Sequence, residues 1–254
     1  MLVSHESPLS LLELSTVYND YDYALVHLFE TEPSYREFFE KNIKSRIMYL
    51  DNSIFELGKA WDPDKFKDYC NHFCDINENN FYYIVPDSLE NKKETISNFE
   101  NFHFDRGHKI CVVQGKTFDE VIECFDYFKG NCEVIGISFD YSFYLNSNGK
   151  TNFEKYMYGR IQLMNYLFLT GRLENTKIHL LGCFLPQEFR AYRHIKEIFS
   201  IDTSNPVVHG IKGIRYNKYG LSFKETTKLV DLLHYDGKLE DILYNIKEFK
   251  KFIV

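Results

Sequence analysis

Two aspartates each follow a short apolar run that is typical of a buried strand. Asp51 follows residues 47–50, and Asp202 follows residues 198–201. A polar residue at the carboxyl end of a buried parallel strand is where an α/β barrel places its chemistry. Two carboxylates at one barrel mouth could catalyse displacement at an acetal-like carbon, one attacking the carbon while the other moves a proton.

Two segments between these aspartates are built in the same way. Asp87 ends one apolar run, and Gln114 and Gly115 follow another. A glutamine side chain presents both a donor and an acceptor to a heterocycle. Phe55 lies close behind the first aspartate and could offer a stacking face to a planar base.

The aspartates and the phenylalanine also have a purely structural interpretation, whereas a glutamine at a barrel rim has little structural reason to be there. Asp51 and Asp202 are equally consistent with turn-forming aspartates that leave a strand. Asp87 stands directly before Ser88, a candidate helix N-cap. Phe55 could pack in the core of a chain that is 17% aromatic. The residues alone leave both interpretations open.

The composition limits the class of protein. The chain has 254 residues, 44% of them hydrophobic, which predicts a single domain with a substantial core over residues 1–254. The formal net charge of −7 excludes a global basic field, but a local basic groove stays compatible with it. No run approaches the roughly 20 apolar residues of a membrane span, and the first residues lack the basic start of a signal peptide. We therefore expect no membrane partner and a cytoplasmic location.

The six cysteines lack the spacing of a disulfide scaffold, which favours a reducing cytoplasm. Cys70, His72 and Cys74 are the one candidate for a metal cluster. A zinc site needs about four ligands, and no second cluster is visible. Positions 70 and 74 share a helix face, so we expect these thiols to pack and predict no metal site.

Short apolar runs alternate with longer amphipathic stretches, as in repeated βα units. The expected strands are residues 1–5, 24–28, 46–50, 82–85, 109–113, 134–138, 178–181 and 198–201. The expected helices are residues 34–44, 63–73, 88–102, 117–128, 155–170, 186–195, 222–233 and 239–252, with N-caps at Thr117 and Ser222. This pattern predicts an α/β fold of the TIM-type (β/α)8 barrel class. An open doubly wound sheet is the main alternative, but it would usually carry a glycine-rich phosphate loop after its first strand, and none is found there.

The order of the motifs carries a family resemblance. In chain order they are L-D-N-S-I-F-E at 50–56, V-P-D-S at 85–88, V-Q-G at 113–115, V-I-G-I-S at 134–138, H-L-L-G at 179–182 and the strand that ends at Asp202. This order resembles the tRNA-guanine transglycosylase superfamily, and within it the DpdA-like 7-deazaguanine DNA transglycosylases of phages and bacteria. The similarity extends over residues 1–210 and is thin between the motifs. Members of this superfamily are TIM barrels that exchange guanine in a nucleic acid for a 7-deazaguanine base.

The resemblance implies a role for each motif. Asp202 would be the nucleophile that attacks C1′ of deoxyguanosine and leaves a covalent glycosyl intermediate. Asp51 would be the general base that removes the ring proton of the incoming base, 7-cyano-7-deazaguanine or a derivative. Phe55 would stack on the purine, and Asp87 would read its Watson–Crick edge. The other residues implied to bind the base are Gln114, Gly115, Gly136, Ile137 and Gly182. No cofactor is implied.

The implied partners are DNA with its target guanine flipped out, the free 7-deazaguanine base and, as in the tRNA enzymes, a second copy of the chain. Phosphate contacts dominate the affinity of proteins for nucleic acids, so basic residues near the motifs are candidates. These candidates are Lys116, Arg190, Arg193, Lys212, Arg215 and Lys218.

Three departures from the tRNA enzymes favour a compact relative that acts on DNA in a cytoplasm, that of the host if a phage encodes it. No cysteine follows Cys183, so the zinc-binding region near the C-terminus of the tRNA enzymes is missing. Asn52-Ser53-Ile54 stands in place of a small glycine pair, and residues 203–206 replace an L-P-T-R segment. A tRNA-guanine transglycosylase, a non-catalytic nucleic-acid-binding relative and a glycosidase that merely removes a base remain as alternatives.

Overall fold

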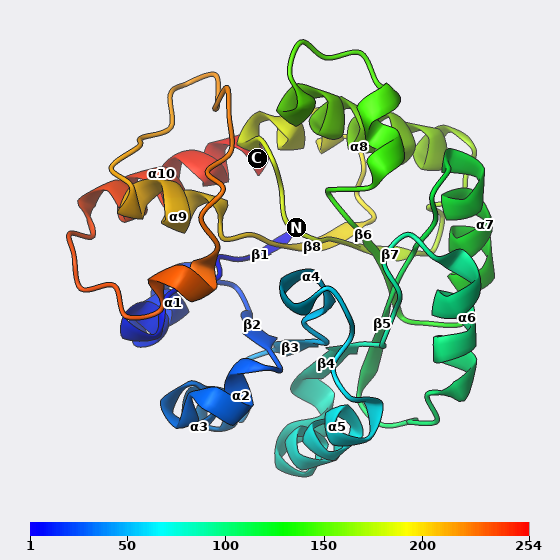
Figure 1. The fold of residues 1–254 in the computed structure, drawn as a ribbon, viewed down its shortest axis with the longest axis horizontal. Helices are drawn as coiled ribbons and strands as arrows, with labels where there is room; N and C mark the ends of the chain where they lie inside the picture. The colour runs from blue at the N-terminus through cyan, green and yellow to red at the C-terminus, as the bar shows by residue number, and fades with distance from the viewer. Residues whose placement is uncertain (254) are drawn as a thin grey trace. The chain divides into compact units, whose positions relative to one another are not determined.

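The computed structural model describes residues 1–253, with the side chain of Val230 left undescribed. Eight strands form one sheet in the order β1-β8-β7-β6-β5-β4-β3-β2, and each registered pair is parallel. The strands are β1 Leu2–Ser4, β2 Asp22–Leu25, β3 Met48–Asp51, β4 Phe81–Ile84, β5 His108–Val112, β6 Val134–Ile137, β7 Lys177–Leu180 and β8 Ile198–Asp202. Helices alternate with these strands along the chain (Figure 1). The fold is therefore of the predicted TIM-type (β/α)8 class.

The helical segments comprise α-helices and short 3-10 turns. The α-helices are α1 Leu12–Tyr18, α2 Leu28–Thr31, α3 Pro33–Asn42, α4 Ile54–Leu57, α5 Pro63–Asn77, α6 Lys92–Asn101, α7 Phe118–Phe128, α8 Asn152–Leu169, α9 Asn205–Ile211 and α10 Glu240–Ile253. The 3-10 turns are η1 Leu9–Leu11, η2 Glu78–Asn80, η3 Ser142–Asn146, η4 Pro186–Tyr192 and η5 Leu229–Leu232. Within the described residues, no helix is long and apolar enough to cross a bilayer.

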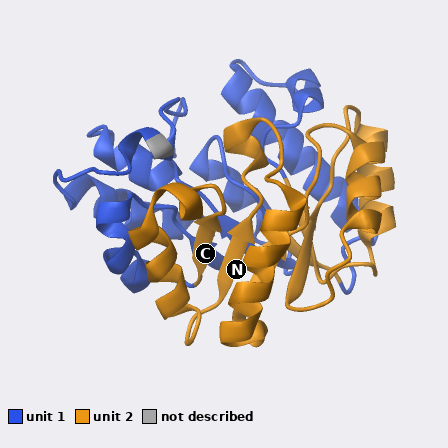
Figure 2. Ribbon diagram, turned by 60° about the horizontal axis from the view of Figure 1, so that its bottom comes forward, with its two compact units in different colours: residues 1–20, 138–175, 180–254 blue, residues 21–137, 176–179 orange. Residues whose placement is uncertain are grey.

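The chain divides into two compact units, coloured separately in Figure 2. The first unit comprises residues 1–20, 138–175 and 180–254, and the second comprises residues 21–137 and 176–179. This division does not decide whether residues 1–254 fold as a single domain, so that expectation stays a prediction; Val254 lies outside the described residues.

The second unit contains the five consecutive strands β2 to β6 with the helices along them, and also residues 177–179 of β7. All residues of β2, β3, β4 and β6 are buried, as expected for parallel strands that are covered on both faces. The interior is aromatic: the Tyr49 ring lies 4.4 Å from that of Tyr21 and 4.9 Å from that of Tyr82. The predicted N-cap at Thr117 is confirmed, because its hydroxyl accepts a hydrogen bond from the Glu120 backbone.

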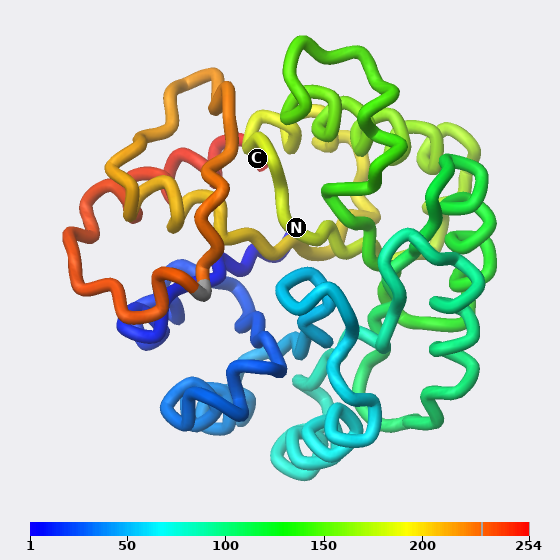
Figure 3. Tube along the Cα trace, in the orientation of Figure 1, coloured from blue at the N-terminus to red at the C-terminus, as the bar shows by residue number. Residues whose placement is uncertain are grey.

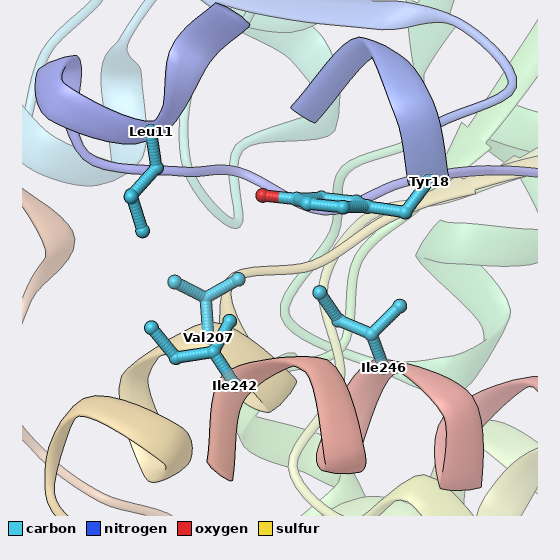
Figure 4. Packing of buried hydrophobic residues seen from close by; sticks show 5 residues of the cluster. All are labelled: Leu11, Tyr18, Val207, Ile242 and Ile246. Atoms are coloured by element: carbon cyan, nitrogen blue, oxygen red, sulfur yellow. The ribbon is translucent and has the colours of Figure 1, made fainter. Parts of the chain in front are cut away.

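The first unit packs α1 against α9 and α10. Leu11 and Tyr18 point toward Val207, Ile242 and Ile246, and the five side chains form one buried cluster (Figure 4). The small size of Gly210 is required here, because a Cβ at this position would lie 2.5 Å from the Ile242 backbone. The close approach fixes α9, which begins directly after β8.

Two of the predicted helices differ from the structure. Residues 222–228 form no helix, and the predicted N-cap at Ser222 is wrong; Figure 3 shows this segment as part of the loop that follows α9. Gln187 hydrogen-bonds both the N–H and the carbonyl of Leu221, and the Glu225 N–H donates to His209. These long-range contacts replace the intrahelical bonds. Residues 186–192 form a 3-10 helix where an α-helix was predicted, and α1, α2, α4 and α9 were not predicted.

His5 directly follows β1, and its ring is surrounded by aromatic side chains. Its ring is 5.3 Å from that of Phe249 and 6.0 Å from that of Tyr18, and within residues 1–253 neither ring nitrogen has a hydrogen-bond partner. Burial, with added repulsion from Lys250, lowers the pKa of His5 from 6.5 to about 3. The imidazole is therefore neutral in the folded chain at neutral pH.

We expect His5 to weaken the fold as the pH falls below 6.5. Between pH 6.5 and about pH 3 the His5 imidazole binds a proton in the unfolded chain but not in the folded chain. The free energy of unfolding therefore falls as the pH falls through this range. The slope contributed by this one group is about 1.4 kcal/mol per pH unit. Urea unfolding at pH 7 and pH 5 should show a smaller loss for His5→Phe than for the wild type. The control variant His234→Gln, which changes an exposed histidine, should retain the wild-type loss.

Candidate active site

Asp51 is the last residue of β3, and its side chain is only 8% exposed. One carboxylate oxygen accepts a hydrogen bond from the Ser53 N–H at 2.5 Å, and the other accepts from the Tyr23 hydroxyl. The bond to Ser53 forms the Asx turn that the structural interpretation of Asp51 predicts. Ser53 has a φ of 61°, a left-handed conformation that glycine adopts more readily.

Three successive strand ends meet at the carboxylate of Asp87. Asn52, which follows β3, donates to Asp87 Oδ1 at 2.8 Å and to the Val85 carbonyl at 3.2 Å. Gln114, which follows β5, donates to Asp87 Oδ2 at 2.6 Å. All three polar side chains are at most 4% exposed. The structure thus brings together two of the predicted base-binding residues and adds Asn52.

The electrostatics of this group are dominated by desolvation. Burial raises the pKa of Asp87 above its usual value, while the amide donors of Asn52 and Gln114 oppose that shift. The Gln114 oxygen accepts from the Glu90 N–H at 2.9 Å, so this glutamine has a structural role that the sequence did not reveal.

Phe55 and the glycines lie near the same strand ends. Phe55 sits in α4 and is 45% exposed, so the alternative of core packing is wrong for this ring. Gly115 passes against α7, where a Cβ would lie 2.7 Å from Glu120. Gly136 and Ile137 are the buried final residues of β6, and the Gly136 carbonyl accepts from the Val113 N–H. Their expected contact with a base stays a prediction.

In the first unit, Asp202 is the last residue of β8 and is 5% exposed. It lies in register with Ser4 of β1, and the pairing continues past it because the Thr203 N–H donates to the Ser4 carbonyl. The Asn205 N–H donates to the Thr203 hydroxyl, which closes a turn directly after the aspartate. The side chain of Asn205 is fixed by the Phe184 carbonyl at 3.0 Å and by the hydroxyl of Tyr216.

Gly182 follows β7 and approaches an aromatic ring. It has a φ of 56°, and a Cβ there would lie 2.7 Å from the Phe139 ring. Its carbonyl accepts from Arg160, a fully buried residue that also pairs with Glu188 at 2.6 Å. The ring of Phe139 thus occupies the space that a side chain at position 182 would need, so only glycine fits there.

The six basic candidates lie on exposed positions. Arg215 pairs with Glu240 and Asp241, and Arg190 stacks on the Phe252 ring with 4.4 Å between guanidinium and centroid. Arg193 donates to the Lys251 carbonyl. Lys116 stands before α7, Lys212 directly follows α9, and Lys218 lies in the loop beyond it. These contacts leave the prediction of phosphate binding open.

The zinc alternative does not fit the structure. Cys70 and Cys74 are buried on one face of α5, as predicted, whereas His72 is exposed and hydrogen-bonds Glu40. All six cysteines are free thiols. Within residues 1–253, no group of three histidine, cysteine, aspartate or glutamate side chains could hold a metal ion.

No protein-family model matches the chain, and no curated protein gives a significant match. The family resemblance therefore depends on the motifs and on where the fold places them.

We predict that Asp87→Asn destabilises the fold by about 1–3 kcal/mol. Asn52 and Gln114 both donate to this carboxylate, and an asparagine would turn one of its two acceptors into a third donor. Adding Gln114→Glu should restore stability, since a carboxylate there can accept from the new amide and from the Glu90 N–H. Urea unfolding of the single and double variants, with exposed Asp236→Asn as control, measures the coupling. A single variant as stable as the wild type would contradict the network.

Proposed function

We propose that the chain is a DNA-guanine transglycosylase, a pentosyltransferase that exchanges guanine in DNA for 7-cyano-7-deazaguanine or a derivative. The observation that carries the proposal is that Asp51 and Asp202 are each the last residue of a strand in a (β/α)8 fold. Chemistry in such folds is located at the carboxyl ends of the strands. The motif order described above then gives the two carboxylates different roles.

The reaction needs no cofactor. The Asp202 carboxylate attacks C1′, the N9–C1′ bond breaks, and its electron pair leaves with guanine, which takes up a proton from solvent water; solvent later receives the proton that Asp51 removes from the incoming base. The 7-deazaguanine base then loses its ring proton to Asp51, and the nitrogen electron pair displaces Asp202 from C1′. The bond to Tyr23 and the turn at Ser53 favour the base role for Asp51, because they fix the direction of both of its oxygens.

Base recognition would use the carboxylate–amide group and the exposed aromatic ring. Asp87 can accept from the N–H groups of a guanine-type Watson–Crick edge, and the second Gln114 N–H can donate to its carbonyl. Phe55 could cover a face of the purine. The choice of DNA over tRNA follows the resemblance to the DNA-modifying branch described above.

We expect Asp202→Ala to abolish incorporation of labelled 7-cyano-7-deazaguanine into guanine-containing DNA. The variant lacks the nucleophile, so no glycosyl intermediate forms. The measurement is nuclease digestion followed by detection of the modified nucleoside, with Asp119→Asn as a control that removes an exposed carboxylate. Substantial incorporation by Asp202→Ala would exclude Asp202 as the nucleophile.

The same assay distinguishes the alternative functions. Adding an equal amount of tRNA shows which of the two polymers is modified. Release of guanine without incorporation of the 7-deazaguanine base would indicate a hydrolase.

Asp51→Asn should slow exchange by about 10²–10⁴-fold, the usual contribution of general acid–base catalysis. The asparagine oxygen can still accept from the Ser53 N–H, and its amide N–H can donate to the Tyr23 hydroxyl, but the side chain cannot take the ring proton. Rates measured under single-turnover conditions, beside Asp202→Ala, show whether both carboxylates serve one reaction. A wild-type rate for Asp51→Asn would contradict the base assignment.

A further inference from the structure

Lys224 of the first unit is held over two aromatic rings. Its ammonium nitrogen lies 4.1 Å from the ring centroid of Phe139 and 4.8 Å from that of Phe184. Phe139 follows β6 and Phe184 follows β7, so the cluster lies at the carboxyl ends of strands. Within residues 1–253, no hydrogen bond or ion pair satisfies the three N–H donors of this lysine.

The backbone on both sides of Lys224 is fixed. The Gln187 side chain holds Leu221 through bonds of 2.7 and 3.0 Å, and His209 of α9 accepts from the Glu225 N–H. Gly220 permits this arrangement, because a Cβ there would lie 1.9 Å from the Gln187 oxygen. The lysine is therefore presented at a defined place on an irregular loop.

The charges around Lys224 leave its ammonium poorly compensated. Burial lowers its pKa. Cys183, Asp140 and Glu6 act in the opposite direction without forming an ion pair with it, and Arg160 repels it. A partly buried cation that contacts only ring faces gains from an anionic oxygen, which would accept its N–H donors.

The same cluster is tied to the segment that follows Asp202. The Phe184 carbonyl accepts from the Asn205 side chain at 3.0 Å, and the Cys183 sulfur lies 3.5 Å from the Thr203 hydroxyl. Thr203 and Asn205 form the turn directly after Asp202. An anion on Lys224 would thus be bound beside the residue that is the candidate nucleophile.

We propose that Lys224, with the rings of Phe139 and Phe184, forms a subsite for one backbone phosphate next to the nucleotide that Asp202 attacks. The inference rests on the proposed function for its polymer. A phosphodiester suits the subsite because it is anionic at every relevant pH and each nucleotide carries one. Binding of one phosphate would position C1′ for attack, and this contact would not depend on the base sequence of the DNA.

The test uses single-stranded oligodeoxynucleotides with one guanine and one neutral methylphosphonate placed at each flanking position in turn. We expect wild-type affinity, measured by fluorescence anisotropy, to fall about tenfold at one position, as for the loss of a charged hydrogen bond. Lys224→Gln should bind the all-phosphate strand about tenfold more weakly and lose sensitivity at that position. Lys224→Arg should keep the wild-type profile, and the exposed control Lys247→Gln should leave it unchanged.

The outcomes separate this inference from the proposed function. If Lys224→Gln keeps the wild-type methylphosphonate profile, the subsite is wrong even where exchange activity is present. If the profile changes as expected but no base exchange is found, the subsite stands and the exchange proposal fails. If neither DNA nor an RNA strand of the same sequence binds, both are overturned. Thermal unfolding measures whether each variant is folded. A loss of affinity in Lys224→Gln counts only if that variant is folded. If it is not, the methylphosphonate profile of Lys224→Arg is compared with that of the wild type instead.

Discussion

A carboxylate removed from water must be given hydrogen-bond donors, and Asp87 obtains them from two neighbouring strand ends. Asn52 follows β3 and Gln114 follows β5, so one buried anion binds the segments on both sides of its own strand. Gln114 extends the network to the Glu90 backbone. Because an unpaired buried charge costs several kcal/mol, these loops cannot move independently of one another. The same constraint fixes Asn52, and with it the chain directly after Asp51.

A buried ion pair fixes the backbone at a strand end in the first unit in a similar way. The fully buried guanidinium of Arg160 binds Glu188 and also the carbonyls of Leu181 and Gly182. Such a pair is weak evidence for net stability, because desolvation offsets much of the attraction. Its bonds to two backbone carbonyls nevertheless fix the segment after β7, which carries Cys183 and Phe184. In both units, buried polar groups determine where the strand-end residues lie.

The sequence was informative about elements whose signals are local. Each of the eight strands overlaps a predicted one, because parallel strands buried on both faces read as largely apolar runs. The strand expected at 24–28 was misplaced, since β2 spans Asp22–Leu25 and α2 begins at Leu28. The helix expected at 222–233 was wrong because contacts from Gln187 and His209, remote in sequence, hold Leu221 and Glu225 in a loop. The roles of Asn52 and Lys224 had no local signal for the same reason. Asn52 is recognisable only once β4 and β5 place Asp87 and Gln114 beside it, and Lys224 only once Phe139 and Phe184 lie beneath it.

Both candidate carboxylates lie at strand ends whose surroundings are fixed by hydrogen bonds. Asp51 has its own oxygens oriented, one by a backbone N–H and one by the Tyr23 hydroxyl, whose ring stacks on His179 at 6.0 Å. A base that only receives a proton can keep such bonds throughout the reaction. After Asp202 the backbone is fixed by the bond from the Thr203 N–H to the Ser4 carbonyl of β1 and by the side chain of Asn205, which donates to the Phe184 carbonyl. In the proposed reaction the nucleophile forms a bond at carbon, and a fixed backbone after Asp202 would hold its carboxylate in position for attack on C1′.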